Sequence, residues 1–455
     1  MSGAGTHGAS EQALRELGAR ALAAARAAGA DEADLRLAVG REFTALVRLG
    51  EIEVLKQAAS RTLELRVFKD RRQALLALCE PAPAALPALA AEAVALAASC
   101  APDPLHRLPE PAAYAQSSPA LDLRDASGGP PTATGIALAR ELEAVAMAAD
   151  PRIDNSQGAG FASGEGELLY MASNGFAGWT TSSQFSLSVM PVATDSAGER
   201  VTDGWAKRSR HFSDLDGPAG LGAEAARRVL RRLDARSAPT GRFPVLFEPR
   251  MAARLVGMLF RCLAGDLVWR RRSYLAERLG TAVASPLVTL IDEPHRSRGL
   301  GSRPWDGEGL PGARLALVEA GLLRHFATDL ESARRLAQPA TGHGVWGGGV
   351  AASNLYLAPG ATSPAAMLAS TPRGLIVTGM LGGGFQSASG HWSQGCTGLW
   401  IEGGEIAYPV REVAVAGNLD EILGAVDAVG DDLDFSLGAV VAPTLRVAEL
   451  TVGSR

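Results

Sequence analysis

The chain has 455 residues, of which 47% are hydrophobic and 20% charged, and its net charge is -5 at pH 7. This length and composition are typical of a soluble globular protein with two or three domains. The negative net charge, with no compensating basic block, argues against binding to nucleic acid or to an anionic membrane surface.

The sequence has no pattern expected of a secretory signal, a membrane span or a disulfide framework. Residues 1–10 lack a basic stretch followed by an apolar one. The alanine-rich run 87–102 contains Glu92 and is shorter than the roughly 20 strongly apolar residues that a span needs. Four cysteines are scattered along the chain without a C-x-x-C pair: Cys79, Cys100, Cys262 and Cys396. These features predict a cytoplasmic protein.

The first part of the chain, residues 1–105, is expected to form an α/β domain. Apolar spacing predicts a helix over 10–29 and further helical turns within 82–99. Alternating apolar residues between them predict strands, with a hairpin-like glycine in "RLGEIE": 34–39, 43–58 and 61–69. The proline-rich segment 101–132 is expected to be a linker.

Residues 106–238 are expected to form the linker and a β-rich central domain. Helices are predicted over 134–149 and 223–235, with alternating strands between them. Three short sequences in this block are typical of turns: "GEGE" (164–167), "SNGF" (173–176) and "DSAGER" (195–200).

Residues 239–455 are expected to form a large C-terminal domain with antiparallel sheets. A helix begins near Pro249, a strand is predicted over 286–293, and many short strands follow the glycine-rich loop 299–313. The chain lacks the regular alternation of strand and helix that marks a doubly wound fold. The predicted fold class is therefore α+β.

Two loop motifs could carry chemistry on their residues alone. Asp306 and Glu308 in "DGEG" could share acid–base roles or hold a hard cation, and the alternative is a structured turn. The glycine-rich runs 345–350 and 379–385 lack the lysine and Ser/Thr of a phosphate loop, which favours simple backbone bends.

Histidine and serine patterns give little support for a catalytic site. None of the seven histidines has a second histidine four residues away or lies in an H-E-x-x-H motif, and no G-x-S-x-G motif occurs. His295 and His343 have the most loop-like surroundings and are the best candidates for a polar role. Ordinary hydrogen bonding is the alternative for both.

The stretch "LVGMLFRCLAGD" (255–266) predicts an amphipathic helix rather than a reactive site. Its apolar positions form one stripe that includes Cys262, which indicates a packed thiol: Met251, Leu255, Met258, Leu259 and Cys262. Three arginines fall on the other side, where their permanent charge would repel a metal cation: Arg250, Arg254 and Arg261.

Several long motifs resemble the TldD/PmbA (TldE) family of modular metallopeptidases along nearly the whole chain. They include "SNGFAG", "SPLVTLIDEPHRSRGLGSRPWDGEGLP", "ATGHG", "SNLYLAPG" and "WIEGGEIAYPVREVAVAGNLDEIL". The sequence "DEPHRSRGLGSRPWDGEG" most closely resembles the PmbA/TldE branch.

The resemblance implies that this chain lacks the zinc motif of the active TldD branch. That branch carries an H-E-x-x-x-H helix and a later cysteine ligand. Aligning the shared "L-x-G-D" (Leu263–Asp266) replaces the first histidine by Val256, the glutamate by Gly257 and the second histidine by Arg261. The late segment 431–445 contains no cysteine. The resemblance therefore implies no catalytic residue, metal ligand or cofactor in this chain.

The family's organisation implies a TldD-like zinc peptidase subunit as partner, with the zinc in that partner and unfolded or extended peptides as substrates. The glycine-rich loops 299–313 and 345–350 would line the peptide channel or the subunit interface. The candidate residues are His295, Arg298, Arg303, Asp306, Glu308 and His343.

Two other readings stay open. The chain could be a metallopeptidase on its own, with metal held by His295, His343, Asp306 and Glu308. It could also be a homomeric peptide-binding protein, and a homodimer is expected if the chain acts alone.

Overall fold

A computed structural model describes residues 4–454. Its largest feature is a long curved sheet with the order β3-β2-β1-β4-β5-β6, in which β7 also pairs with β5. The strands are β1 (Glu32–Arg48), β2 (Glu51–Lys69), β3 (Arg72–Cys79), β4 (Ile153–Ala172), β5 (Ala177–Thr194), β6 (Arg200–Thr202) and β7 (Trp205–Ser209). Because β1 pairs antiparallel with β4, strands of the expected first and second domains belong to one sheet.

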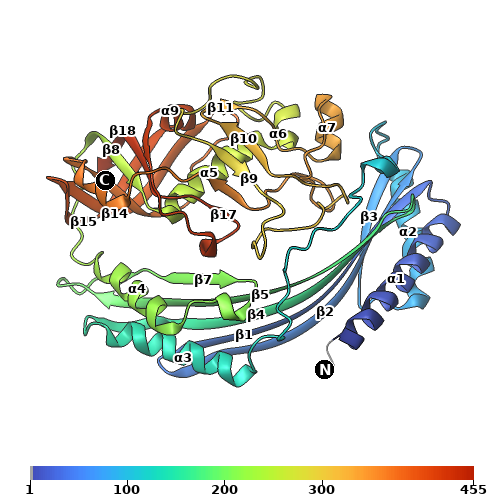
Figure 1. Cartoon of the computed structure of the whole chain (residues 1–455), viewed down its shortest axis with the longest axis horizontal. Helices are drawn as coiled ribbons and strands as arrows, with labels where there is room; N and C mark the ends of the chain where they lie inside the picture. The colour runs from blue at the N-terminus through green and yellow to red at the C-terminus, as the bar shows by residue number, and fades with distance from the viewer. Residues whose placement is uncertain (1–3, 455) are drawn as a thin grey trace.

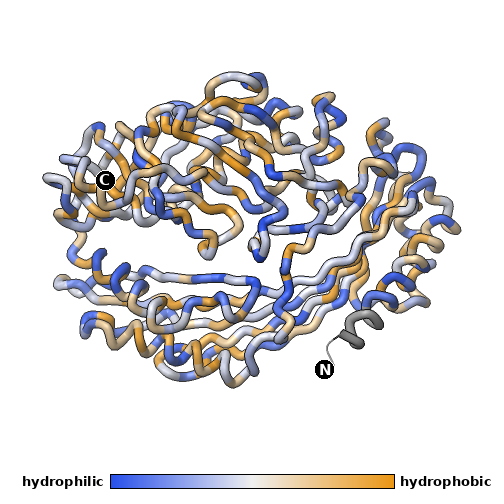
Figure 2. The backbone as a smooth tube through the Cα atoms, viewed as in Figure 1, coloured by the Kyte–Doolittle hydropathy of each residue, from blue (hydrophilic) through white to orange (hydrophobic). Residues whose placement is uncertain are grey.

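Four helices cover one face of this sheet (Figure 1): α1 (Ala4–Ala27), α2 (Leu86–Ser99), α3 (Thr132–Ala148) and α4 (Pro218–Leu230). Hydrophobic and hydrophilic residues alternate along the long strands (Figure 2). Leu35 and Leu37 of β1 are fully buried in the core with α1 and α2. Their neighbours Asp34 and Arg36 point to the opposite face, which is covered by the C-terminal part of the chain.

The C-terminal part contains two smaller sheets, of order β15-β14-β13-β8-β18-β16 and β11-β10-β9-β12-β17. The first comprises β8 (Gly241–Phe247), β13 (Arg373–Leu381), β14 (His391–Glu402), β15 (Glu405–Asn418), β16 (Val426–Val429) and β18 (Leu445–Ser454). The second comprises β9 (Leu290–Asp292), β10 (Leu315–Glu319), β11 (Leu322–Leu323), β12 (Leu355–Leu357) and β17 (Val440–Val441).

Helix α5 (Pro249–Leu263) packs against β8 and β13 of one small sheet and β12 and β17 of the other, so it lies at the centre of the largest core. The remaining helices are short: α6 (Gly265–Trp269), α7 (Leu330–Leu336), α8 (Pro364–Ala369) and α9 (Leu419–Gly424). Single 3-10 turns occur at Pro83–Ala85, Pro111–Ala113, Phe212–Asp214 and Phe435–Leu437.

The α+β class with antiparallel sheets is confirmed, although β12 pairs with β17, and β13 with β8, in parallel. The hairpin predicted at "RLGEIE" is also confirmed, since Leu49 and Gly50 form the turn between β1 and β2 with φ of 52° and 82°. Among the helices within residues 4–454, none combines the length and the apolar character needed to cross a bilayer.

Three local predictions were wrong. The "GEGE" segment is not a turn, because Gly164 and Gly166 lie inside β4 and pair with β1 on one side and β5 on the other. The strand expected over 286–293 is only Leu290–Asp292. The first helix begins at Ala4 rather than at residue 10.

Candidate functional site

The helix that resembles the family's metal-binding helix is regular and places its three key positions in different surroundings. Val256 is 5% exposed and belongs to the core between the small sheets. Gly257 borders open space, since a Cβ built there would meet no atom within 4 Å. The Arg261 side chain is 50% exposed and lies 3.4 Å from the Asp266 carboxylate. Positions five apart on an α-helix point about 140° apart, so Val256 and Arg261 do not converge.

Cys262, on the same helix, is a packed thiol as predicted. It is fully buried, and burial raises its pKa to about 12. Its Sγ lies 3.9 Å from the carbonyl oxygen of Ser387. A thiol with this pKa is neutral at physiological pH and is a poor nucleophile and metal ligand.

Two of the predicted loop residues, His295 and Arg298, lie on the surface. Arg298 donates to the carboxylates of Asp122 (2.6 Å) and Asp214 (2.9 Å), and its backbone N–H donates to Leu121. Arg298 therefore fastens the linker and the segment after β7 to the C-terminal part. This contact is structural.

Asp306 and Glu308 are buried next to each other in a tightly hydrogen-bonded loop. Asp306 accepts the backbone N–H groups of Glu308, Leu310 and Gly344, each at 2.9 Å. Glu308 accepts the N–H of Leu330 at 2.7 Å. A Cβ at Gly344 would lie 2.6 Å from Glu308, so the close approach requires glycine. Burial raises the pKa of Asp306, and burial with the Asp306 charge raises that of Glu308 to about 8.

A charged cluster that was not predicted from the sequence faces these carboxylates from the large sheet. Arg66 of β2 donates to both oxygens of Asp34, at 2.9 and 2.5 Å, and the Tyr170 hydroxyl donates to Asp34 at 2.8 Å. The Arg66 guanidinium also stacks over Trp346, 5.1 Å from the ring centroid. In the sequence, Asp34 and Arg66 both occupy the polar positions of alternating strands, so neither residue signalled a buried pair.

His343 is buried, and both of its ring nitrogens face neighbouring side chains. Nδ1 lies 2.9 Å from the Thr341 hydroxyl, and Nε2 lies 3.2 Å from Asp292. Burial opposes ionisation of Asp292, but hydrogen bonds from His343 and Ser353 hold its pKa below the usual value. The His343 ring packs near Phe260 of α5, at 6.0 Å between centroids. The histidine thus lies close to the helix without facing a free volume.

A cavity of about 360 Å³ lies between the large sheet and these loops. Its walls come from β1, β4 and β5 on one side and from loops 303–307 and 344–351 on the other, and include Arg36, Leu168, Tyr170, Arg303, Trp305, Asp306 and Trp346. Arg303 and Asp306 are the two predicted site residues that line it. The other four, Glu308, His295, Arg298 and His343, are not among its lining residues.

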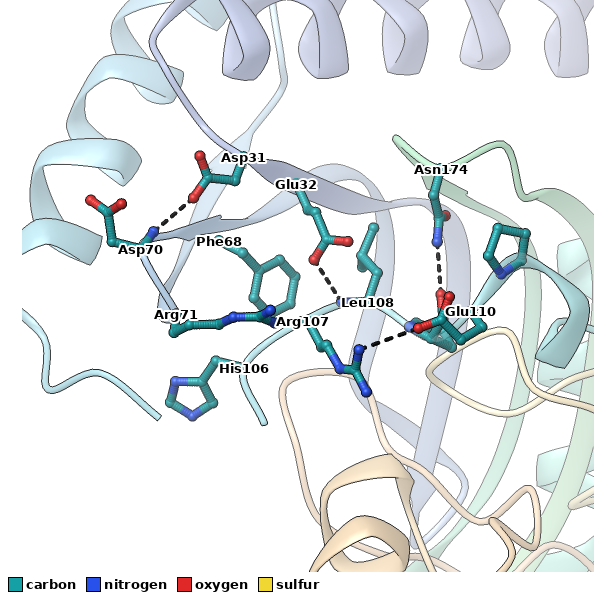
Figure 3. Close-up of a pocket in the computed structure, with 12 residues that line it drawn as sticks. Asp31, Glu32, Phe68, Asp70, Arg71, His106, Arg107, Leu108, Glu110 and Asn174 are labelled. Atoms are coloured by element: carbon teal, nitrogen blue, oxygen red, sulfur yellow. Dashed lines mark hydrogen bonds and ion pairs between the residues drawn. The ribbon is translucent and has the colours of Figure 1, made fainter. Parts of the chain in front are cut away.

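A second cavity, of about 350 Å³, lies where the linker crosses the large sheet (Figure 3). Its polar side chains are engaged locally: Glu32 accepts the Leu108 N–H at 3.0 Å, and Arg107 donates to Glu110 at 3.3 Å. This cleft contains none of the predicted site residues.

Comparison with known proteins identifies the family. Models of the three PmbA/TldA metallopeptidase domains match residues 33–97 (domain 1), 126–233 (central domain) and 240–454 (C-terminal domain). The chain belongs to the TldD/PmbA metallopeptidase family. Metalloprotease PmbA of Escherichia coli O157:H7 is 31% identical over 423 residues, 92% of each chain. The PmbA homologue of Haemophilus influenzae is 31% identical over 447 residues, 97% of each chain.

Solved structures of TldD/PmbA-like proteins share the fold. A Bacteroides thetaiotaomicron protein described as a candidate modulator of DNA gyrase has a TM-score of 0.91 at 26% identity, covering 97% of this chain and 99% of that one. TldE of Thermococcus kodakarensis has a TM-score of 0.86 at 20% identity, covering 95% and 99%.

The residues that this TldD/PmbA chain offers on α5 do not fit a zinc ion. Zinc takes thiolate, imidazole and carboxylate donors, whereas Val256 and Gly257 have no side-chain donor atom, and a cationic guanidinium such as that of Arg261 repels a metal ion. Within residues 4–454, no three His, Cys, Asp or Glu side chains gather closely enough to hold a metal.

Proposed function

We propose that this chain is a non-catalytic subunit of a heteromeric zinc peptidase, in which a TldD-like chain holds the metal and cleaves unfolded or extended peptides. The observation that carries the proposal is the donor-free set of Val256, Gly257 and Arg261 on a regular helix. With no ligand to bind zinc, the helix cannot activate a water molecule for peptide hydrolysis.

The proposed role of the chain is to bind and position the peptide. The cavity between the large sheet and the loops that carry Arg303 and Asp306 is the proposed peptide site. The proposed domains are 1–105, 106–238 and 239–455, and the three family matches fall within these limits. The cytoplasmic location stays a prediction from sequence.

The test compares the purified chain alone, a TldD-like subunit alone and the two together on an unfolded model peptide. The proposal expects no cleavage by this chain alone, and cleavage by the mixture that chelation abolishes. Zinc-dependent cleavage by this chain without a partner would contradict it.

The stand-alone metallopeptidase would need His295, His343, Asp306 and Glu308 to share a metal. His295 is exposed, whereas the other three are buried and already engaged by neighbouring groups. A homomeric peptide-binding protein is distinguished by copurification, since it would not bind a TldD-like subunit.

A further inference from the structure

The cavity between the large sheet and the C-terminal loops contains the half-buried guanidinium of Arg303, whose buried Nε has no hydrogen-bond partner among the described residues. Arg303 donates to two carbonyl oxygens, of Gly342 at 3.2 Å and Ala351 at 3.1 Å. Among residues 4–454, Asp292 and Asp306 attract the guanidinium through space, but no carboxylate is hydrogen-bonded to it. A buried N–H group without a partner is costly, and a bound anion would satisfy it.

Two arginines face the cavity from opposite walls, and the carboxylate that lines it is held by other groups. Asp306 lines the same cavity, but its oxygens accept three backbone N–H groups from its own and the neighbouring loop. Burial also raises the pKa of Asp306, which weakens its negative charge. Arg36 lines the opposite wall, its side chain is 40% exposed, and Glu64 lies 3.8 Å away. Two guanidinium groups therefore line one volume, and the donors of Arg303 are only partly used by protein carbonyl oxygens.

The remaining walls are apolar and aromatic. Trp305 and Trp346 come from the C-terminal loops, and Leu168 and Tyr170 come from β4. Trp305 packs edge-on against Phe176, and Trp346 packs edge-on against Tyr170, at 6.0 and 5.7 Å between centroids. These contacts fix both indoles, so the walls are preformed.

We propose that this cavity binds the C-terminal residue of a peptide, with the α-carboxylate on Arg303 and an apolar side chain between the indole walls. Guanidinium groups recognise planar carboxylates through paired N–H donors. The α-carboxylate fits better than an acidic side chain, because one residue must supply both the anion and the apolar group. This inference names the ligand class of the proposed peptide site.

The experiment uses the full chain without any zinc subunit, so its outcome does not depend on whether the chain belongs to a heteromeric peptidase. Acetyl-Ala-Ala-Phe with a free carboxylate and its C-terminal amide are titrated by calorimetry. We expect the acid to bind at least about tenfold more tightly than the amide. Equal binding of the two peptides, or tighter binding of acetyl-Ala-Ala-Glu amide, would overturn the proposal.

Variants locate the site. Arg303→Gln should bring the affinity of the acid down to that of the amide, and Arg36→Gln should cause a smaller loss. Arg314→Gln, which changes an exposed arginine elsewhere, should leave binding unchanged. If Arg303→Gln unfolds the chain, Trp346→Leu should weaken both peptides equally. An Arg303→Gln protein that folds and still prefers the acid excludes the site.

An independent observation concerns the edge of the large sheet. Over Glu51–Ser60, β2 pairs only with β1, because β3 pairs with β2 from Thr62 onward. Nearly every side chain of this segment is exposed, including Ile52 (40%), Val54 (41%) and Leu55 (55%). At about 3.4 Å per residue the open edge is roughly 30 Å long. An open edge of this length that exposes apolar side chains is a template for pairing with another strand.

We propose that this edge pairs antiparallel with the same edge of a second copy, with Leu55 facing Leu55 at the two-fold axis. In an antiparallel pair, two residues that face each other point their N–H and C=O groups either both toward the partner strand or both away from it. In this symmetric pair, an odd-numbered residue therefore faces an odd-numbered residue. Registers centred on Glu53 or Lys56 place like charges opposite each other and are disfavoured. A register centred on Val54 would place the apolar Leu55 opposite the charged Glu53. The register centred on Leu55 instead places Glu53 opposite the polar Gln57.

Cross-linking tests this register in a Cys79→Ser background, which removes the exposed native thiol. Leu55→Cys should form a disulfide-linked dimer on mild oxidation, and Gln57→Cys, which faces Glu53, should not. Sedimentation should show that Leu55→Lys is monomeric and that Leu279→Lys, at an exposed leucine elsewhere, is still dimeric. A monomeric wild-type chain, or association only with a TldD-like subunit, would overturn the proposal.

Discussion

Glu308 sits in a buried acidic loop that would be costly to ionise fully. Its pKa is raised to about 8 by burial and by the Asp306 charge, and the attraction of Arg66 opposes the rise. The folded chain thus holds this proton up to about pH 8, whereas an unfolded glutamate releases it near pH 4.3. The folded state binds more protons over this window, so stability falls as pH rises through it.

Replacing Glu308 by glutamine should remove this pH dependence. The amide oxygen of Glu308→Gln can still accept the Leu330 N–H, but the side chain no longer ionises. Urea unfolding should show a variant that is more stable than the wild type at pH 8 to 9, with the difference shrinking as the pH is lowered. A variant that becomes less stable than the wild type as pH rises would contradict this assignment.

The buried and the exposed cysteines should differ sharply in their reactivity toward thiol reagents. Burial raises the pKa of Cys262 and Cys396 to about 12, whereas Cys79 is exposed. A thiol reagent at pH 8 should label Cys79 in the native chain, and should label Cys262 and Cys396 only after denaturation. Peptide mapping by mass spectrometry reads each site. Rapid native labelling of Cys262 would show that α5 is open rather than packed.

Helix α5 is the element whose residues determine whether this chain could bind zinc. Its fully buried Leu255 packs between the two small sheets, while Gly257 two residues later borders open space. Packing thus stabilises one face of the helix, whereas Gly257 lowers the stability of the helix on the other face. Gly257 is also the position at which the active branch of the family would carry its glutamate.

Two substitutions on α5 should therefore have opposite signs. Gly257→Ala should stabilise the chain by about 0.5–1 kcal/mol, because alanine lowers the entropy cost of a helix interior and meets no neighbour. Leu255→Ala should destabilise it by about 2–5 kcal/mol through lost burial and a cavity. Thermal unfolding measures both. Destabilisation by Gly257→Ala would mean that a neighbouring group fills the open space.

At the scale of the whole molecule, the large sheet and the C-terminal part meet where Arg66 stacks over Trp346, and where Tyr170 and Phe176 pack edge-on against Trp346 and Trp305. Removing Arg66 leaves Asp34 buried without its counter-charge. Arg66→Ala should cost about 3–5 kcal/mol, and the double variant Arg66→Met/Asp34→Asn should recover much of it. Chemical unfolding of the three proteins forms the test. Equal losses in the single and double variants would show that packing, and not charge, dominates the contact.

The sequence predicted the elements with strong local patterns and missed the contacts between distant ones. The hairpin at Gly50 and the apolar stripe of α5 follow from local spacing, so both could be predicted. "GEGE" was misjudged because two flanking strands hold its glycines extended, a tertiary effect. The contact of Arg66 with Trp346, and that of Gly344 with Asp306, joins residues more than 30 positions apart. Composition and spacing carry no record of such contacts.

The central claim is that metal in the proposed assembly belongs to the partner and not to this chain. Native mass spectrometry of the copurified complex, followed by gas-phase separation of the subunits, assigns zinc to one polypeptide. The account predicts that zinc leaves with the TldD-like subunit and that this chain has its metal-free mass. A stoichiometric zinc ion retained on this chain would contradict it.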